Sequence, residues 1–405
     1  MSDLRHGEPL AKQRNIDPIA RTDHPWDLPA TVPLPHRCDC PEDSVLVIPR
    51  EANLPIDREA KKVVARVSQA VVGVASITVY GDQLWRASGF IVEFDESSMI
   101  GTIFSCATVS EHIPMFPKID KIRVYLFDGT SYDATIEACD NHWNLLVLSV
   151  SFGRAVKTMN MVEISENRNA MDVHLQGFVL QPHSASERLC PRDTIIGLGR
   201  QSTEPFGLQA NCGVYSYERW ADLPRFCHEM QKATFINTYA SIGGPAINKN
   251  GGVIGMLFHD LDCTPFMPSN IILKWWDHFK KTRMYCRPTM RVFGVNLHNA
   301  QSSPWVKVPT SLYESYDDGF LVERVPRSVK SAGLQQKDLI ITCNGKPVAT
   351  SLQLFEILAE NIGKMVGVTF IKAEDNSKHS VYLPVEETLE KNFYSWPIVQ
   401  YSNLC

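Results

Sequence analysis

Residues 236–248 read Ile-Asn-Thr-Tyr-Ala-Ser-Ile-Gly-Gly-Pro-Ala-Ile-Asn, and the turn Lys249-Asn250-Gly251-Gly252 and the apolar run 253–257 follow. This pattern predicts a strand that enters a tight turn, a short second strand, an Asn-Gly turn and a buried third strand. Glycine is suited to such turns because it adopts positive φ without steric cost. The stretch therefore indicates a loop held in a β-rich fold.

The residues upstream have the same arrangement of short strands and turns. Strand candidates recur at roughly 8–12 residues from about residue 61 to 260, with no helix-length pattern between them. One of the turns, Asp128-Gly129, is typical of a hairpin. We therefore expect a mainly β fold whose length suits two six-stranded barrels.

The composition is that of an ordinary globular protein. The chain has 405 residues, of which 44% are hydrophobic and 21% charged, and its formal net charge is −5. Without an overall basic field, neither nucleic acid nor an anionic membrane is expected as a partner. Eleven cysteines and a polar start without an apolar segment predict reduced thiols in an intracellular protein, cytoplasmic or nuclear.

Composition and pattern together suggest five segments. Closely spaced prolines disfavour regular structure before residue 58, and a period-3.6 pattern begins after Pro268. The expected organisation is a flexible arm (1–57), a double barrel (58–265), a linker helix (266–289), a small α+β domain (290–386) and a tail (387–405).

The α+β domain contains several short motifs whose combination is typical of one kind of domain. It contains Phe293-Gly294-Val295, Gly319-Phe320-Leu321-Val322, Lys337-Asp338-Leu339-Ile340 and Asn344-Gly345. This string resembles a PDZ domain of the HtrA/Deg type. The resemblance implies a groove between the strand at Phe293 and the helix from Ser351, where a protein C-terminus or an internal segment adds a strand. It also implies peptide-binding residues Phe293, Gly294 and Val295, with the last two amides receiving a carboxylate.

Residues 61–385 as a whole resemble the HtrA/Deg (protease Do-like) serine peptidases, which have a chymotrypsin-like double barrel, and especially their degenerate plant members. Gly243-Gly244-Pro245 matches the end of the family's nucleophile loop and puts Ile242 at the nucleophile position. The resemblance puts Ala240 at the oxyanion-hole glycine, Thr108 at the general base and Asn144 at the orienting aspartate.

These replacements remove the chemistry of the site. An alkyl group cannot attack a carbonyl, a threonine hydroxyl does not accept a proton at neutral pH, and a carboxamide cannot stabilise an imidazolium by charge. We therefore expect a catalytically inactive pseudopeptidase that binds peptides or proteins through its PDZ domain. Two alternatives are an active serine endopeptidase and a regulatory subunit that co-assembles with active Deg paralogues.

Structural roles are favoured for the other residues whose side chains could act in catalysis or bind a metal. His112 is displaced from the base position, and Ser241 needs a register shift to act as nucleophile. Cys106 and Cys212 read as buried thiols. Cys38-Asp39-Cys40 with His36 lacks a second ligand pair, so we expect no metal and no cofactor. Trp26 suggests a contact between subunits, which leaves a homo- or hetero-oligomer open.

Overall fold

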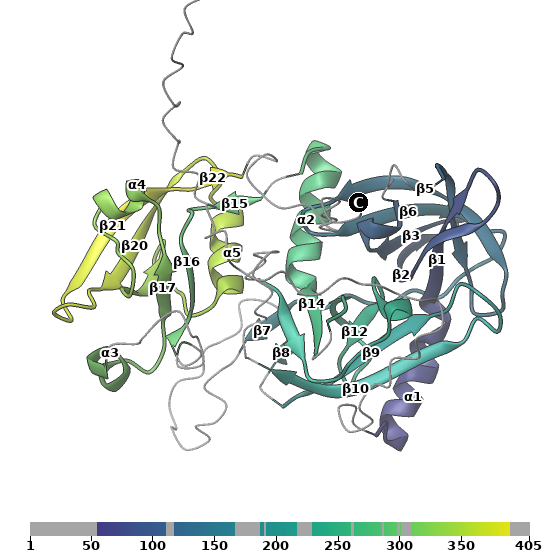
Figure 1. Ribbon diagram of the computed structural model, residues 1–405, viewed down its shortest axis with the longest axis horizontal. Coiled ribbons are helices and arrows are strands. Elements are labelled where there is room, and N and C mark those ends of the chain that lie inside the picture. Colours follow the sequence, from purple (N-terminus) through teal and green to yellow (C-terminus); the bar gives the residue numbers. More distant parts are fainter. Residues whose placement is uncertain are drawn as a thin grey trace, which may run out of the picture. The chain divides into compact units, whose positions relative to one another are not determined.

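Figure 1 shows the computed structural model of the chain. It describes residues 55–110, 117–166, 187–189, 192–216, 229–260, 263–285, 287–297, 300 and 310–388. None of the helices in these ranges is both long and apolar enough to cross a bilayer.

The first barrel is closed by six antiparallel strands in the order β1-β2-β3-β6-β5-β4. It follows helix α1 (Arg58–Val67) and a 3₁₀ turn, η1 (Ser68–Ala70). Asp57 caps α1 by accepting the Ala60 N–H. The strands are β1 (Val71–Thr78), β2 (Gln83–Asp95), β3 (Ile100–Ser105), β4 (Ile119–Tyr125), β5 (Ser131–Asp140) and β6 (Leu145–Ser151), with η2 (Ala107–Ser110) after β3.

The second barrel is closed in the order β10-β11-β14-β13-β12-β9. Its strands are β9 (Thr194–Arg200), β10 (Leu208–Ser216), β11 (Gln231–Ala233), β12 (Pro245–Ile247), β13 (Val253–Leu257) and β14 (Thr264–Pro268). A short parallel pair, β7 (Ile164–Glu166) and β8 (Glu187–Leu189), accompanies them. The predicted mainly β fold with two six-stranded barrels is confirmed.

Helix α2 (Ser269–Thr282) follows β14 directly and buries Trp275, Trp276 and Phe279. Lys280 and Lys281 in its last turn complement the negative end of the helix dipole. The sequence prediction ended the barrels at residue 265, whereas β14 continues to Pro268. The error arose because Pro268-Ser269-Asn270 resembles a helix start and hides the end of the strand.

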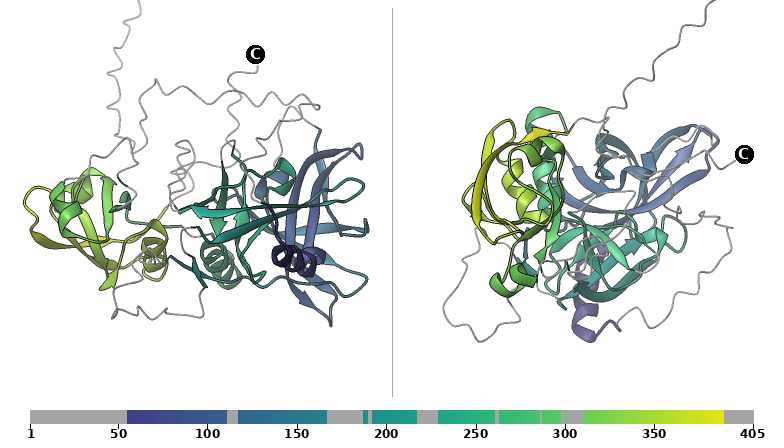
Figure 2. Two further views of the ribbon diagram at one scale, coloured as in Figure 1. Left: turned by 90° about the horizontal axis from the view of Figure 1, so that it is seen from below. Right: turned by 60° about the vertical axis from the view of Figure 1, so that its left-hand side comes forward.

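The C-terminal domain is built on one sheet in the order β16-β17-β18-β20-β21, and none of its described strands joins either barrel (Figure 2). The strands are β16 (Phe293–Asn296), β17 (Phe320–Arg324), β18 (Leu339–Cys343), β19 (Lys346–Pro347), β20 (Met365–Ile371) and β21 (Lys378–Pro384). The helices are α3 (Thr310–Ser315), α4 (Arg327–Ser331) and α5 (Ser351–Ala359). A small pair, β15 (Pro288–Thr289) and β22 (Glu386–Glu387), joins the two ends of the domain.

Residues 236–248 differ from the sequence prediction on their N-terminal side. No strand leads directly into the Gly-Gly-Pro turn. A 3₁₀ turn, η5 (Tyr239–Ser241), stands there instead, and the strand before it, β11, ends at Ala233. The side chain of Asn237 explains the difference, because its Nδ2 donates to the Phe258 carbonyl at 2.7 Å and draws the segment away from the ladder.

Candidate functional site

Thr108 and Asn144, the residues predicted at the base and orienter positions, are hydrogen-bonded to each other. The Asn144 side-chain oxygen accepts two hydrogen bonds from Thr108, at 2.9 Å from its backbone N–H and 3.1 Å from its hydroxyl. Asn144 is 1% exposed and has φ 53°, a left-handed conformation that asparagine tolerates better than most residues. The two side chains therefore satisfy each other and leave no proton acceptor of suitable basicity between them.

The loop at Ile242 has its backbone donor already engaged. The N–H of Ile242 donates to the Tyr239 carbonyl at 3.2 Å, which closes the η5 turn. In a working peptidase of this fold, the nucleophile's own N–H has to point at the developing oxyanion. Here the Tyr239 carbonyl oxygen accepts the Ile242 N–H in place of an oxyanion. At the nucleophile position the loop therefore has an N–H that is already bonded and an alkyl side chain.

Ser88 of β2 holds this arrangement in place. Its N–H donates to the Ile242 carbonyl at 2.8 Å, and its hydroxyl donates to the Ala240 carbonyl at 2.5 Å. The same hydroxyl accepts the Arg200 N–H at 2.7 Å. One buried serine thus links both barrels to the loop and fixes the direction of two of its carbonyl groups.

Gly243 has to be glycine in this loop. Its φ is 79°, and a Cβ atom there would lie 2.6 Å from the Ser88 carbonyl oxygen and 2.8 Å from the Cys106 nitrogen. Real Cβ atoms do not approach so closely, and positive φ adds strain for any side chain. This close approach brings the Ile242 loop against the end of β3, beside Thr108.

The alternative nucleophiles lie in the interior. Ser241 is 1% exposed, and its hydroxyl lies 3.4 Å from that of Thr238. Burial raises the pKa of the Cys106 thiol to about 11, and burial also raises the pKa of Cys212. A thiolate is the reactive form of cysteine, so neither thiol is primed for attack.

The predicted groove residues lie on β16, which is the first strand of the C-terminal sheet. Phe293 is half-buried under the Arg324 guanidinium, whose carbon lies 4.8 Å from the ring centroid. A Cβ on Gly294 would lie 2.2 Å from the Leu321 carbonyl oxygen. Val295 is buried in a cluster with Leu321.

The strand register determines which backbone groups of β16 face β17. Leu297 donates its N–H to the Gly319 carbonyl, and Val295 stands opposite Leu321 two residues earlier. Alternate residues of an antiparallel pair share the same hydrogen-bond direction, so the Val295 N–H faces β17. Gly294 and Asn296 therefore direct their backbone groups away from β17, and the Val295 N–H points toward it.

Five residues that were singled out from the sequence lie outside the described residues: His112, His36, Cys38, Cys40 and Trp26. Among the residues that are described, no group of three or more His, Cys, Asp or Glu side chains is arranged to hold a metal. Leu145, Leu146, Val147 and Leu148 are buried in the barrel core, and Ile242 is half-buried beside it.

Comparison with known proteins gives the chain a fold and one similar sequence. No protein-family model matches it. A curated human protein, "Serine protease HTRA3", is 25% identical over 293 residues, which cover 69% of this chain and 57% of that protein. The solved structure "HtrA-type protease AlgW with tripeptide" superposes with a TM-score of 0.52 at 15% identity, over 81% of this chain and 97% of that one. The chain has the HtrA/Deg fold, and its sequence is similar to that of an HtrA-type serine protease.

The HtrA-like chain spans little more than half the length of HTRA3. The likeness to AlgW concerns the fold, because the sequences share few identities. Two residues of the HtrA-like site were not found from the sequence: Ser88 and Tyr239. Ser88 acts through hydrogen bonds to residues that lie far away in the chain, and Tyr239 acts through the direction of its carbonyl group. Neither feature can be recognised in the local sequence.

Proposed function

We propose that this HtrA-like chain is a pseudopeptidase, which binds peptides or protein segments through a PDZ-like C-terminal domain and does not hydrolyse them. One observation supports the inactive state above all others. Where an attacking atom and a free N–H are needed, the chain has the alkyl group of Ile242 and an N–H already bonded to Tyr239.

The pair Thr108–Asn144 supports the same proposal. A peptidase of this type needs a base that gains a proton and later returns it. Threonine and asparagine have no titration near neutral pH, and here their polar groups bond to each other. Removing any triad member from a working enzyme typically costs a factor of about 10⁴ or more.

The proposed binding site is the side of β16 that faces away from β17, beside α5. An added strand would bond to backbone groups of β16 on this side, such as those of Gly294. Asn296 also ties β16 to the start of α5, because its Nδ2 donates to the Ala349 carbonyl at 3.2 Å. The ligand class is therefore an extended peptide segment.

The binding proposal is tested with a peptide array probed by the full chain. Gly294 is a poor position for mutation, since any Cβ there meets the Leu321 carbonyl and disturbs the fold. N-methylation of a hit peptide at alternate residues tests the strand directly. We expect loss of binding when one set of alternate amides is methylated and little change with the other set; equal effects of both sets would contradict strand addition.

Protein variants complete the test. Phe293→Ala should weaken binding of the hit peptide, because Phe293 lies on the proposed binding strand. Tyr382→Ala on β21, at the opposite edge of the sheet and 70% exposed, is the matched control and should bind normally. Hydrolysis is followed separately with denatured casein, and cleavage that depends on the folded chain would favour the endopeptidase alternative.

A further inference from the structure

The turn between β18 and β19 contains an exposed Asn-Gly pair. Cys343 pairs with Lys346, so Asn344 and Gly345 form a two-residue hairpin loop. Their φ angles are 49° and 77°, and a type I′ turn requires positive φ at both central residues. Both residues are exposed, so the loop presents its peptide group and the Asn344 side chain to solvent.

The backbone nitrogen of Gly345 takes no part in holding this turn. The Asn344 N–H donates to the Gly367 carbonyl at 2.7 Å. Among the residues that the structure describes, none accepts the Gly345 N–H, and none bonds to the Asn344 side chain. An uncommitted backbone nitrogen can attack the side-chain carbonyl carbon of an asparagine that precedes it, and glycine has no Cβ atom to shield that nitrogen. The pair Asn344-Gly345 is therefore arranged for reaction with itself.

The second Asn-Gly pair of the chain, Asn250-Gly251, is restrained instead. The Gly251 N–H donates to the Asn248 carbonyl at 3.0 Å, and the Arg66 guanidinium of α1 donates to the Asn250 carbonyl at 2.5 Å. Gly251 is buried, and a Cβ atom on it would lie 3.1 Å from the Val67 side chain. Here the nitrogen is hydrogen-bonded, and α1 packs against the peptide group.

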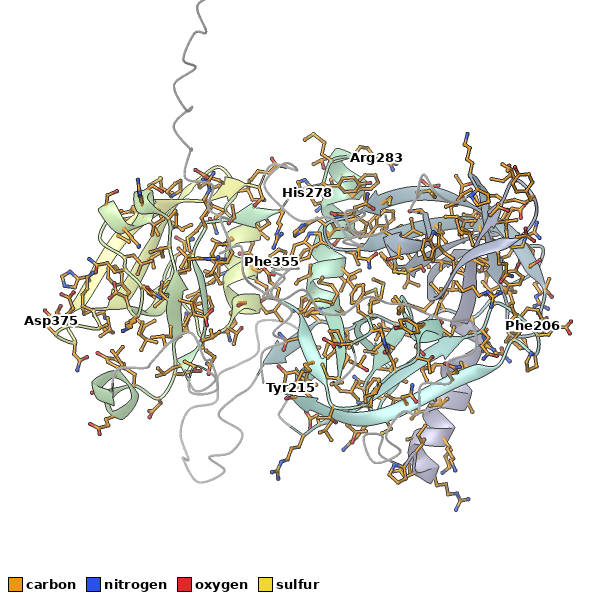
Figure 3. The ribbon with its side chains drawn as sticks, viewed as in Figure 1. Phe206, Tyr215, His278, Arg283, Phe355 and Asp375 are labelled. Atoms are coloured by element: carbon orange, nitrogen blue, oxygen red, sulfur yellow. The ribbon has the colours of Figure 1, made fainter. Side chains whose placement is uncertain are left out.

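The turn between β20 and β21, where Figure 3 labels Asp375, gives a further comparison because it contains Asn376 followed by Ser377. The Ser377 N–H donates to the Asp375 carboxylate at 2.9 Å, and the Ser377 hydroxyl donates to the same oxygen at 2.5 Å. The nitrogen is again engaged, and a side chain shields it. Asn344 thus differs from both other sites in the freedom of the nitrogen that follows it.

We propose that Asn344 is a site of spontaneous deamidation, which proceeds through a succinimide. The Gly345 nitrogen forms a bond to Cγ of Asn344, and the bond from Cγ to Nδ2 breaks. Water passes the proton of the Gly345 N–H to the leaving nitrogen, which departs as ammonia. A water molecule then opens the ring at one of its two carbonyl groups and gives aspartate or isoaspartate. The reaction needs neither peptidase chemistry nor peptide binding, so it goes beyond the proposed function and stands if that function fails.

The two products affect the turn differently. Aspartate leaves the backbone as it is, and Asp-Gly suits a type I′ turn as well as Asn-Gly does. Isoaspartate carries the backbone through Cβ and lengthens a two-residue loop by one carbon atom. Both products add a negative charge two residues before Lys346, whose Nζ lies 2.9 Å from the Glu360 carboxylate at the end of α5. Isoaspartate is therefore the product that disturbs the hairpin.

The experiment follows deamidation in the native full chain and in the chain unfolded by urea, by mass spectrometry of its peptides. In the unfolded chain Asn344 and Asn250 should react at similar rates, because glycine follows each of them. In the native chain we expect Asn344 to react about 2- to 12-fold faster than Asn250, the factor that corresponds to one net hydrogen bond at the Gly251 nitrogen. A native rate at Asn250 that equals or exceeds the rate at Asn344 would overturn the proposal.

An isoaspartyl-specific methyltransferase with labelled S-adenosylmethionine detects the second product. Asn344→Ser removes the carbonyl group that is attacked and should abolish most of the labelling of the aged native chain. Asn250→Ser is the matched control, since it makes the same change at the restrained pair, and should leave the labelling almost unchanged. Undiminished labelling of Asn344→Ser, or aspartate without isoaspartate at residue 344 of the unsubstituted chain, would contradict the succinimide route.

Discussion

Reinstalling the triad alone should not produce an efficient peptidase. The perturbation is the triple variant Thr108→His, Asn144→Asp and Ile242→Ser. In the present loop the N–H of residue 242 donates to the Tyr239 carbonyl, and loss of one oxyanion-hole donor typically costs about 10²- to 10³-fold in kcat. We therefore expect the variant to remain at least about 10²-fold below an active HtrA-type protease.

The assay is hydrolysis of denatured casein and of an activated ester, with circular dichroism as the check on folding. Adding Ala240→Gly lowers the steric cost of turning the Tyr239–Ala240 peptide, so the quadruple variant should exceed the triple one. A triple variant that works within tenfold of the active protease would refute the reasoning, because it would show that the Tyr239 carbonyl does not block the site.

Two further predictions concern stability and reactivity. Arg200 donates to the carbonyls of Ser68, Val71 and Phe206, and burial lowers its pKa to about 10, so it stays charged at neutral pH. Arg200→Met should cost about 2–5 kcal/mol of unfolding free energy in urea, since three carbonyls lose their donor. The control Arg86→Met, at an exposed residue, should change the unfolding free energy by no more than about 0.5 kcal/mol. Equal losses of unfolding free energy in the two variants would contradict the stabilising role of Arg200. Iodoacetamide at pH 8 should label half-buried Cys139 and spare Cys106, and preferential labelling of Cys106 in the native chain would be the opposite result.

Much of the fold could be predicted because local signals agreed with the global arrangement. The Gly-Gly-Pro and Asn-Gly turns, the Asp128-Gly129 hairpin and the spacing of short apolar runs each require a particular backbone conformation. Gly129 and Gly243 do adopt positive φ. β4 alternates between buried and more exposed residues, whereas β1, β13 and β14 are buried along their whole length.

The details of the site could not be predicted in the same way. The 3₁₀ turn at Tyr239 depends on a carbonyl direction set by Ser88, which lies 152 residues earlier than Ala240. The strand expected before the turn failed because the Asn237 side chain bonds to Phe258 instead of leaving its segment in the ladder. Such long-range polar contacts override a local strand preference.

We infer that the folded chain has no activated serine. The direct measurement is treatment of the native full chain with a fluorophosphonate probe, followed by mass spectrometry of its peptides, with an active trypsin-like protease as positive control. We expect no serine adduct that forms in the native chain and is lost on denaturation. An adduct on Ser241, or on any other serine, that appears in the native chain and disappears on denaturation would contradict it.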